Sequence, residues 1–209
     1  VYLWMTAALA ITGITAMAVN NSYAMQQFIF GSRFMFFGLI IAELALVWYV
    51  SARIQSLSFT TATGLFMLYS FINGLTLSVI FLAYTTTSIA STFFVTAGTF
   101  GAMSLYGYFT KKDLTSLGNL LFMLLIGLII ATVVNIFWAN STLYWITTYA
   151  GIFIFVGLTA YDTQKIKRLL SGQEITEESQ KMALLGALSL YLDFINLFLY
   201  LLRIFGDRK

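Results

Sequence analysis

The sequence predicts an all-α membrane protein, a seven-transmembrane-helix bundle with the last helix central. Hydrophobic residues make up 60% of the chain and charged residues only 9%, whereas a soluble domain carries about 25% charged residues. The apolar residues also form seven long runs, and about 20 apolar residues are needed to cross a bilayer as a helix. The last run contains Ser189, Tyr191, Asp193 and Asn196, which find partners more easily inside the bundle than in lipid.

The seven predicted spans are separated by short connections, apart from one polar stretch at residues 163–182. Backbone groups in lipid must be satisfied within their own segment, so the spans are expected to be helices. The strict alternation of a β-barrel is absent from the run at residues 124–130. The predicted spans cover, approximately, residues 1–19, 34–50, 59–84, 89–109, 117–138, 143–162 and 183–205.

Small residues recur four apart in these spans, for example Gly98 with Ala102 and Ala183 with Ala187. Such pairs allow two helices to approach closely, although any alanine-rich span contains some of them. Proline is absent, so no kink can be assigned to it.

The length and composition limit the classes of function. A chain of 209 residues predicts one domain over residues 1–209. There is no cysteine and no histidine, which removes thiolate chemistry and the commonest metal ligand. The net charge of +3 does not suggest nucleic acid as a partner. No cleavable signal peptide is evident, and since Val1 is not a methionine, we expect a polar stretch to precede it.

Lysine and arginine in short loops predict the orientation. The cations of the internal loops follow even-numbered spans, with Arg33 the exception, so the N-terminus is expected in the cytoplasm. Seven full spans would then place Arg203, Arg208 and Lys209 outside, against the rule. Either the bundle overrides these charges or the last segment re-enters and leaves on the cytoplasmic side. The cations that follow even-numbered spans are Arg53, Lys111, Lys112, Lys165, Lys167, Arg168 and Lys181.

Three acids lie in the spans: Glu43 midway along the second, Asp162 at the end of the sixth, and Asp193 within the seventh. A carboxylate at membrane depth costs about 3 kcal/mol on insertion scales, so each is a candidate functional residue. Arg53, near the cytoplasmic end of the second span, is predicted at a depth similar to that of Asp162. Counting residues places Asp193 about 15 Å along its helix from Ala183, deeper than Asp162, unless tilt or a different helix start brings the two together.

If Asp162 and Asp193 meet, they cannot both ionise cheaply, and one proton would be shared. This would let a protein without histidine respond to pH. The alternatives are a solvated helix end beside Lys165 for Asp162, an inter-helix hydrogen bond for Asp193, and passive packing for Glu43.

Catalysis is not expected. The serines have no histidine to activate them, and no glycine-rich phosphate loop appears. Intramembrane aspartyl proteases pair a Tyr-Asp with a Gly-x-Gly-Asp motif. Tyr161-Asp162 fits the first motif, but Asp193 follows Tyr191-Leu192. We therefore predict that the protein is not an enzyme and has no cofactor.

Three segments resemble the Bax inhibitor-1 family, the transmembrane Bax inhibitor motif proteins. They are GLTAYDTQKIK at residues 157–167, ALSLYLDFINLF at residues 187–198, and the stretch from Gly98 to Asp113 with SLYGY and KKD. The likeness covers essentially the whole chain, and the chain is similar to bacterial inner-membrane members of the family. It implies a seven-helix fold with a central last helix.

The resemblance further implies a pH-sensitive calcium leak channel of the bacterial inner membrane. Asp162 and Asp193 match the proton-sharing pair and would form a weak calcium site, with calcium as the permeant ion. Arg53 matches a cytoplasmic latch and Glu43 a pore-lining acid, both by position more than by motif. Some bacterial relatives are instead linked to a membrane protease as regulators without ion transport, which is the alternative function. The expected partners are the bilayer, calcium ions and protons, or such a protease.

The predicted orientation can be tested with single cysteines. A cysteine at position 86 should react with an impermeant reagent added outside the cell, and one at position 175 should not, because the loop charges place residues 85–88 outside and 163–182 inside. Labelling at 175 but not at 86 would reverse the orientation.

Overall fold

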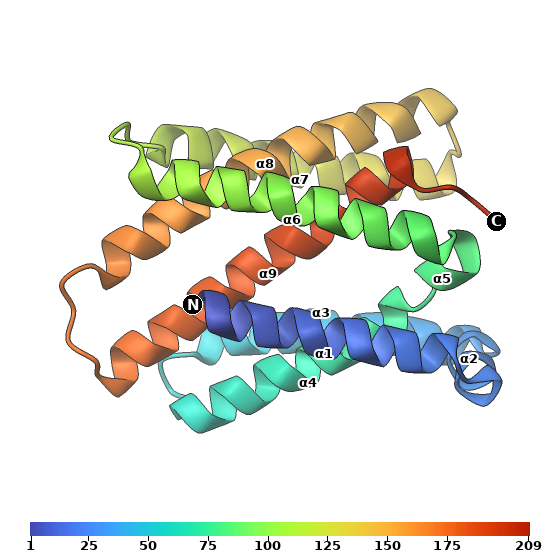
Figure 1. The fold of residues 1–209 in the computed structure, drawn as a ribbon, viewed down its shortest axis with the longest axis horizontal. Coiled ribbons are helices and arrows are strands. Elements are labelled where there is room, and N and C mark those ends of the chain that lie inside the picture. Colours follow the sequence, from blue (N-terminus) through green and yellow to red (C-terminus); the bar gives the residue numbers. More distant parts are fainter. The chain divides into compact units, whose positions relative to one another are not determined.

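The computed structural model describes residues 1–209, and every regular element in it is an α-helix (Figure 1). Seven helices are long and apolar enough to cross a membrane, which confirms the predicted fold class. The last of these helices is also the most interior, because 61% of the residues in its most apolar 18-residue stretch are buried. The helices are α1 (Tyr2–Asn20), α2 (Tyr23–Phe30), α3 (Arg33–Arg53), α4 (Phe59–Leu77), α5 (Ile80–Ala83), α6 (Thr86–Phe109), α7 (Thr115–Phe137), α8 (Ser141–Leu170) and α9 (Glu177–Phe205).

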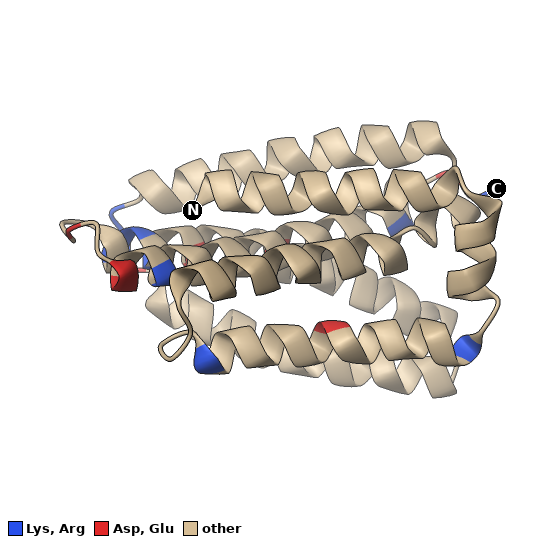
Figure 2. Ribbon diagram, turned by 90° about the horizontal axis from the view of Figure 1, so that it is seen from below, with Lys and Arg blue, Asp and Glu red and all other residues tan.

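The chain divides into two compact units. The first unit contains residues 1–84, 172–191 and 209, and the second contains residues 85–171 and 192–208. Helix α9 is continuous and contributes residues to each unit. The single-domain organisation stays a prediction. Figure 2 shows that the charged residues gather mainly near helix ends and connections, and that the helix bodies carry almost none.

In the first unit, α1 and α3 both pack against α4. A Cβ atom at Gly74 would meet the Thr12 carbonyl and the Thr15 side chain, so α1 and α4 approach closely there. In the most apolar 18-residue stretch of α3, only 6% of the residues are buried. Large apolar side chains such as Phe34, Ile41 and Trp48 are exposed. Such a surface is stable in lipid, where apolar side chains need no cover.

In the second unit, α8 packs against both α6 and α7. Its core combines side chains of α7, α8 and the C-terminal part of α9. Tyr200 stacks on Phe155 with ring centroids 5.9 Å apart. The buried core consists of Leu121, Leu128, Ile154, Phe155, Leu158, Leu197, Tyr200 and Leu201.

The polar connection predicted at residues 163–182 is mostly helical, so α8 and α9 extend beyond the two predicted spans that flank it. Helix α8 continues to Leu170 and α9 already begins at Glu177. Polarity marks where a chain leaves the bilayer, but it does not end a helix whose backbone bonds are satisfied internally. The charges also suit the helix dipoles, with Lys167 and Arg168 in the last turn of α8 and Glu177 and Glu178 in the first turn of α9.

The third span is interrupted without a proline. The hydroxyl group of Ser78 donates to the carbonyl of Leu75, three residues back. The amides of Phe81 and Leu82 also bond three residues back. Such local side-chain bonds compete with the regular ladder and bend helices, which separates α5 from α4.

Helix α9 does not re-enter. It runs unbroken over 29 residues, which corresponds to about 43 Å at 1.5 Å per residue. At its end, the Arg203 guanidinium lies 5.2 Å from the centre of the Tyr144 ring, and Arg208 donates to the Tyr144 hydroxyl at 3.1 Å. Tyr144 belongs to the first turn of α8, so the terminal arginines lie at the end of the second unit where α8 begins. The structure therefore shows no re-entrant last segment, and the side of the membrane on which the C-terminus lies stays a prediction.

Close helix contact in the second unit occurs at Gly107 rather than at Gly98. A Cβ at Gly107 would overlap the backbone of Ala160 on α8, whereas a Cβ at Gly98 would meet nothing within 4 Å. The small pair Gly98 and Ala102 therefore does not mediate this contact.

Gly107→Ala should lower the thermal unfolding midpoint of the purified protein in detergent. Forcing a methyl group against the Ala160 backbone costs about 1–3 kcal/mol in a packed interior. Gly98→Ala in the same helix is the matched control and should leave the midpoint unchanged. Equal midpoints for the two variants would contradict the close approach of α6 to α8.

Candidate functional site

Asp193 is a deeply buried carboxylic acid of the second unit. It lies on α9, its side chain is 5% exposed, and its Oδ2 atom has no hydrogen-bond partner. A buried polar atom without a partner is uncommon in proteins and requires an explanation. The alternative in which Asp193 only makes an inter-helix hydrogen bond does not account for this atom.

Asp162 lies close enough to Asp193 for their charges to repel each other. It is half-buried on α8, eight residues before the helix ends at Leu170. Lys165, one turn further along, provides a nearby positive charge. Asp162 is thus not a solvated helix end, although Lys165 is its neighbour as that alternative required.

The positions of the helix ends do not by themselves explain why Asp162 lies close enough to Asp193 for their charges to interact. Residue counting had placed Asp193 well below an Asp162 at the membrane boundary. Since α8 continues past Asp162, Asp162 lies about 12 Å inside its own helix end at 1.5 Å per residue. Asp193 lies 16 residues from the start of α9 at Glu177, or about 24 Å, so counting from the helix ends still places the two carboxylates at different depths.

Glu43 is the acid of the first unit, and its carboxylate is satisfied by hydrogen bonds. The Thr76 hydroxyl donates to Oε1 at 2.5 Å and the Asn73 amide donates to Oε2 at 3.4 Å. Both donors lie on α4, so this contact links the largely exposed α3 to the rest of its unit. Asn73 thus helps to join α3 to α4.

The Glu43 network continues to α9 and α1. The Tyr191 hydroxyl donates to Asn73 Oδ1 at 3.1 Å and lies 2.7 Å from the Thr12 hydroxyl. Tyr191 is fully buried, with Phe66 and Tyr69 in edge-to-face contact with its ring. Four helices of the first unit therefore meet in one polar network. The sequence had marked Tyr191 only as part of a polar segment and gave no role to Thr12.

Arg53 is exposed and is the last residue of α3. It belongs to the first unit and Asp162 belongs to the second. The Arg53–Asp162 latch stays a prediction.

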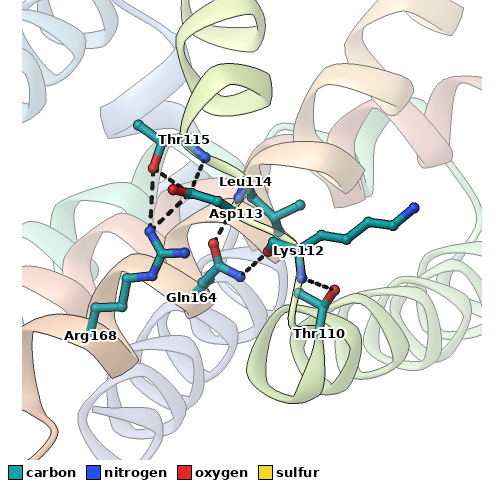
Figure 3. Close-up of polar contacts among 7 residues, drawn as sticks. All are labelled: Thr110, Lys112, Asp113, Leu114, Thr115, Gln164 and Arg168. Atoms are coloured by element: carbon teal, nitrogen blue, oxygen red, sulfur yellow. Dashed lines mark hydrogen bonds and ion pairs between the residues drawn. The ribbon is translucent and has the colours of Figure 1, made fainter.

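A group of polar contacts fixes the start of α7 to the extension of α8 (Figure 3). The Gln164 side chain accepts from the Leu114 amide at 2.9 Å and donates to the Lys112 carbonyl at 2.8 Å. Arg168 forms an ion pair with Asp113 at 2.9 Å. We call these contacts the α7–α8 clasp. Gln164 follows Asp162 by two residues, so the clasp holds the part of α8 that carries Asp162.

The structure contains no group of three or more acidic side chains that could hold a metal ion. The two aspartates supply at most four oxygens, whereas calcium takes six to eight oxygen ligands. The calcium site at Asp162 and Asp193 stays a prediction, and any ion there needs water and backbone carbonyls as further ligands.

The fold and these buried acids define a polytopic α-helical membrane protein. The carboxylate of Glu43 is fully hydrogen-bonded, whereas one oxygen of Asp193 has no hydrogen-bond partner. Residues 1–209 match the model of a family described as "Inhibitor of apoptosis-promoting Bax1". The chain belongs to this Bax inhibitor-1 family.

Several relatives match over nearly the whole chain. The inner membrane protein YbhL of Escherichia coli K12 is 56% identical over 100% of this chain and 90% of its own length. An uncharacterized protein of Rickettsia prowazekii is 46% identical over 100% of this chain and 88% of its own. An uncharacterized protein of Borreliella burgdorferi is 45% identical over 98% and 89%. The name of the Escherichia coli relative supports an inner-membrane location, and none of the three names assigns an activity.

The carboxylate of Asp113 in the α7–α8 clasp should remain charged over the physiological pH range. Hydrogen bonds from the Thr115 side chain and amide, and then from Arg168, lower the pKa of Asp113 from 3.8 to about 2. A depressed pKa contributes stability above the ordinary value, and this contribution is lost only as the pH falls through about 2. Asp113→Asn should therefore shift the unfolding midpoint equally at pH 5 and pH 8. A shift that differs between these pH values would contradict a permanently charged Asp113.

Proposed function

We propose that this protein is a pH-sensitive calcium leak channel of the bacterial inner membrane, gated by Asp162 and Asp193. The observation that carries the proposal is the meeting of two carboxylates inside one unit, with Asp193 buried and one of its oxygens unpartnered. Buried ionisable groups of this kind mark ion pathways and proton relays in membrane proteins. A purely structural acid would be satisfied by donors, as Glu43 is.

The proposed closed state holds one proton between the two aspartates. Because two adjacent negative charges repel each other, one protonated carboxyl and one carboxylate form the stable combination in a buried site. Loss of the shared proton at higher pH leaves two repelling charges. The repulsion separates α8 from α9 at this level and favours an open state lined by carboxylates.

Arg53 and Glu43 have separate roles in this proposal. Arg53 acts as a latch that holds ionised Asp162 in the closed state. Glu43 provides an acid on the ion path of the first unit, where Thr76 and Asn73 orient its carboxylate. Hard oxygen atoms suit calcium, and an incomplete ligand set suits an ion that passes rather than one that stays bound.

The proposed orientation places the N-terminus in the cytoplasm. The cations of the α6–α7 connection, and those near the end of α8 and the start of α9, then face the cytoplasm, as the positive-inside rule requires. The C-terminal arginines would lie on the other face, with Arg203 over the rings of Tyr144 and Tyr200 and Arg208 bonded to the Tyr144 hydroxyl. Their favourable contacts with aromatic rings offset part of the preference for the cytoplasmic side.

Calcium flux into liposomes that contain only this protein tests the function. Wild-type flux should rise between pH 5 and pH 8, because deprotonation of the pair opens the path. Asp193→Asn should keep flux at its low-pH level up to pH 8, since asparagine keeps the size and a hydrogen-bonding amide but cannot ionise. Arg53→Ala should raise the basal flux, because the closed state loses its latch.

Asp207→Asn is the matched control, because it removes an exposed acid of the same unit outside both the pair and the clasp and should leave the flux profile unchanged. If wild-type protein gives no calcium flux at any pH from 5 to 8, the channel is wrong and a regulator of a membrane protease is favoured. A wild-type profile in Asp193→Asn would instead show that the aspartate pair is not the sensor.

A further inference from the structure

Buried oxygens without partners are concentrated in the second unit. Four buried side-chain oxygens of the protein have no hydrogen-bond partner, those of Thr63, Thr92, Ser104 and Asp193. The last three belong to the second unit. Thr92 is fully buried and Ser104 is 7% exposed. Each hydroxyl loses its hydration on burial and gains no bond from the protein, which is unfavourable.

Thr92 and Ser104 differ in this respect from other hydroxyl residues of the same unit. Thr96, Thr148 and Thr159 each donate to the carbonyl four residues earlier, at 2.7–2.8 Å. This local bond is the usual way in which a helix satisfies a threonine or serine in an apolar setting. Thr92 and Ser104 do not make it, so their hydroxyl groups remain available to another partner.

The two residues belong to the buried row of α6. This row repeats mostly every four residues, through Thr92, Thr96, Phe100 and Ser104. From Thr92 to Ser104 it extends about 18 Å at 1.5 Å per residue, which is more than half of a hydrocarbon layer about 30 Å thick. The opposite face of α6 is apolar and exposed, as at Phe94 and Leu105.

The row reaches the level of the aspartate pair. At one end, Gly107 packs directly on the backbone of Ala160, two residues before Asp162. Four residues before Ser104, Phe100 contacts Phe194, the neighbour of Asp193, with ring centroids 5.4 Å apart. Ser104 lies on α6 between these two contacts. Thr96 and Thr92 continue the row away from the pair, towards the start of α6.

One aromatic contact interrupts the polar row. Phe100 and Phe194 are both buried, and their edge-to-face contact separates Ser104 from Thr96. Phe194 also contacts Phe93, at 5.4 Å. Apolar constrictions of this kind close channels by excluding water. Because Phe194 follows Asp193 directly on α9, a movement of Asp193 also moves this ring.

We propose that the buried row of α6 is the polar wall of a water-filled path for hydrated divalent cations, and that Phe100 and Phe194 close it. The inference rests on the proposed channel function and identifies the helix that lines the path. Thr92 and Ser104 supply hydroxyl oxygens to water around the ion. The path continues from the aspartate pair along α6 and opens when Phe194 leaves Phe100.

Cysteine accessibility tests the path without reference to calcium. Because the chain contains no cysteine, Ser104→Cys and Thr92→Cys each introduce a single thiol. A charged methanethiosulfonate reagent, present on both sides of the membrane, should modify them about tenfold faster than a lipid-facing thiol, since only the thiolate reacts and it forms only in water. Leu105→Cys is the matched control, because Leu105 adjoins Ser104 and is 60% exposed on the other face.

Labelling is measured from pH 5 to pH 8 and repeated with Phe100→Ala added. Removal of the aromatic contact should speed the modification of both cysteines further. If Ser104→Cys and Thr92→Cys react no faster than Leu105→Cys at any pH, with and without Phe100→Ala, the α6 path is wrong.

A hydroxyl-removal series connects the path to ion transport. Thr92→Val and Ser104→Ala should reduce calcium flux severalfold without moving its pH midpoint, and Ser91→Ala on the exposed face of α6 should not reduce it. Normal flux with unlabelled cysteines would mean that a channel exists but its path lies elsewhere. Labelled cysteines without calcium flux would retain the hydrated path and overturn the calcium channel.

Discussion

A carboxylate inside a lipid-embedded bundle must find its partners within the protein, and the organisation of this molecule depends on that constraint. Water at the bilayer surface satisfies most of the charges, which lie near helix ends and connections. Glu43 and Asp193 have no such access. The helices that surround them must supply donors, a proton or a water-filled path, because a desolvated and unpaired carboxylate is too costly.

The two units meet this constraint in different ways. In the first, Glu43 accepts from Thr76 and Asn73, and the network continues to Tyr191 and Thr12. A fully connected buried network of this kind fixes one arrangement of helices. In the second, one oxygen of Asp193 has no partner and its nearest acid is Asp162. Because the hydrogen bonds of Asp193 are incomplete, a change in the protonation of the aspartate pair can change how the helices pack around it. This property suits a gate better than a rigid scaffold.

Helix α9 carries one residue of each centre. Tyr191 and Asp193 are two residues apart, so they point about 200° apart around a helix of 3.6 residues per turn. Tyr191 completes the Glu43 network, and Asp193 faces the acid on α8. The continuity of α9 places one residue of each centre on the most buried of the seven spans. The α7–α8 clasp stabilises the other side of the aspartate pair by holding the extension of α8.

The number of spans, the all-helical class and the interior position of the last span were predictable from the sequence alone. They depend on run length and on the cost of polar groups in lipid, which act locally on each segment. The candidate acids were also predictable, because any ionisable residue in an apolar run is unusual. The tertiary structure decided which residues meet. Hydropathy marks the membrane boundary but not the end of a helix, so neither the extension of α8 past Asp162 nor the interaction of Asp162 with Asp193 could be read from the chain. The Glu43 network, the contact of Gly107 with Ala160 and the row from Thr92 to Ser104 likewise depend on helix rotation and packing, since a threonine looks the same in sequence whether it faces lipid or a buried acid.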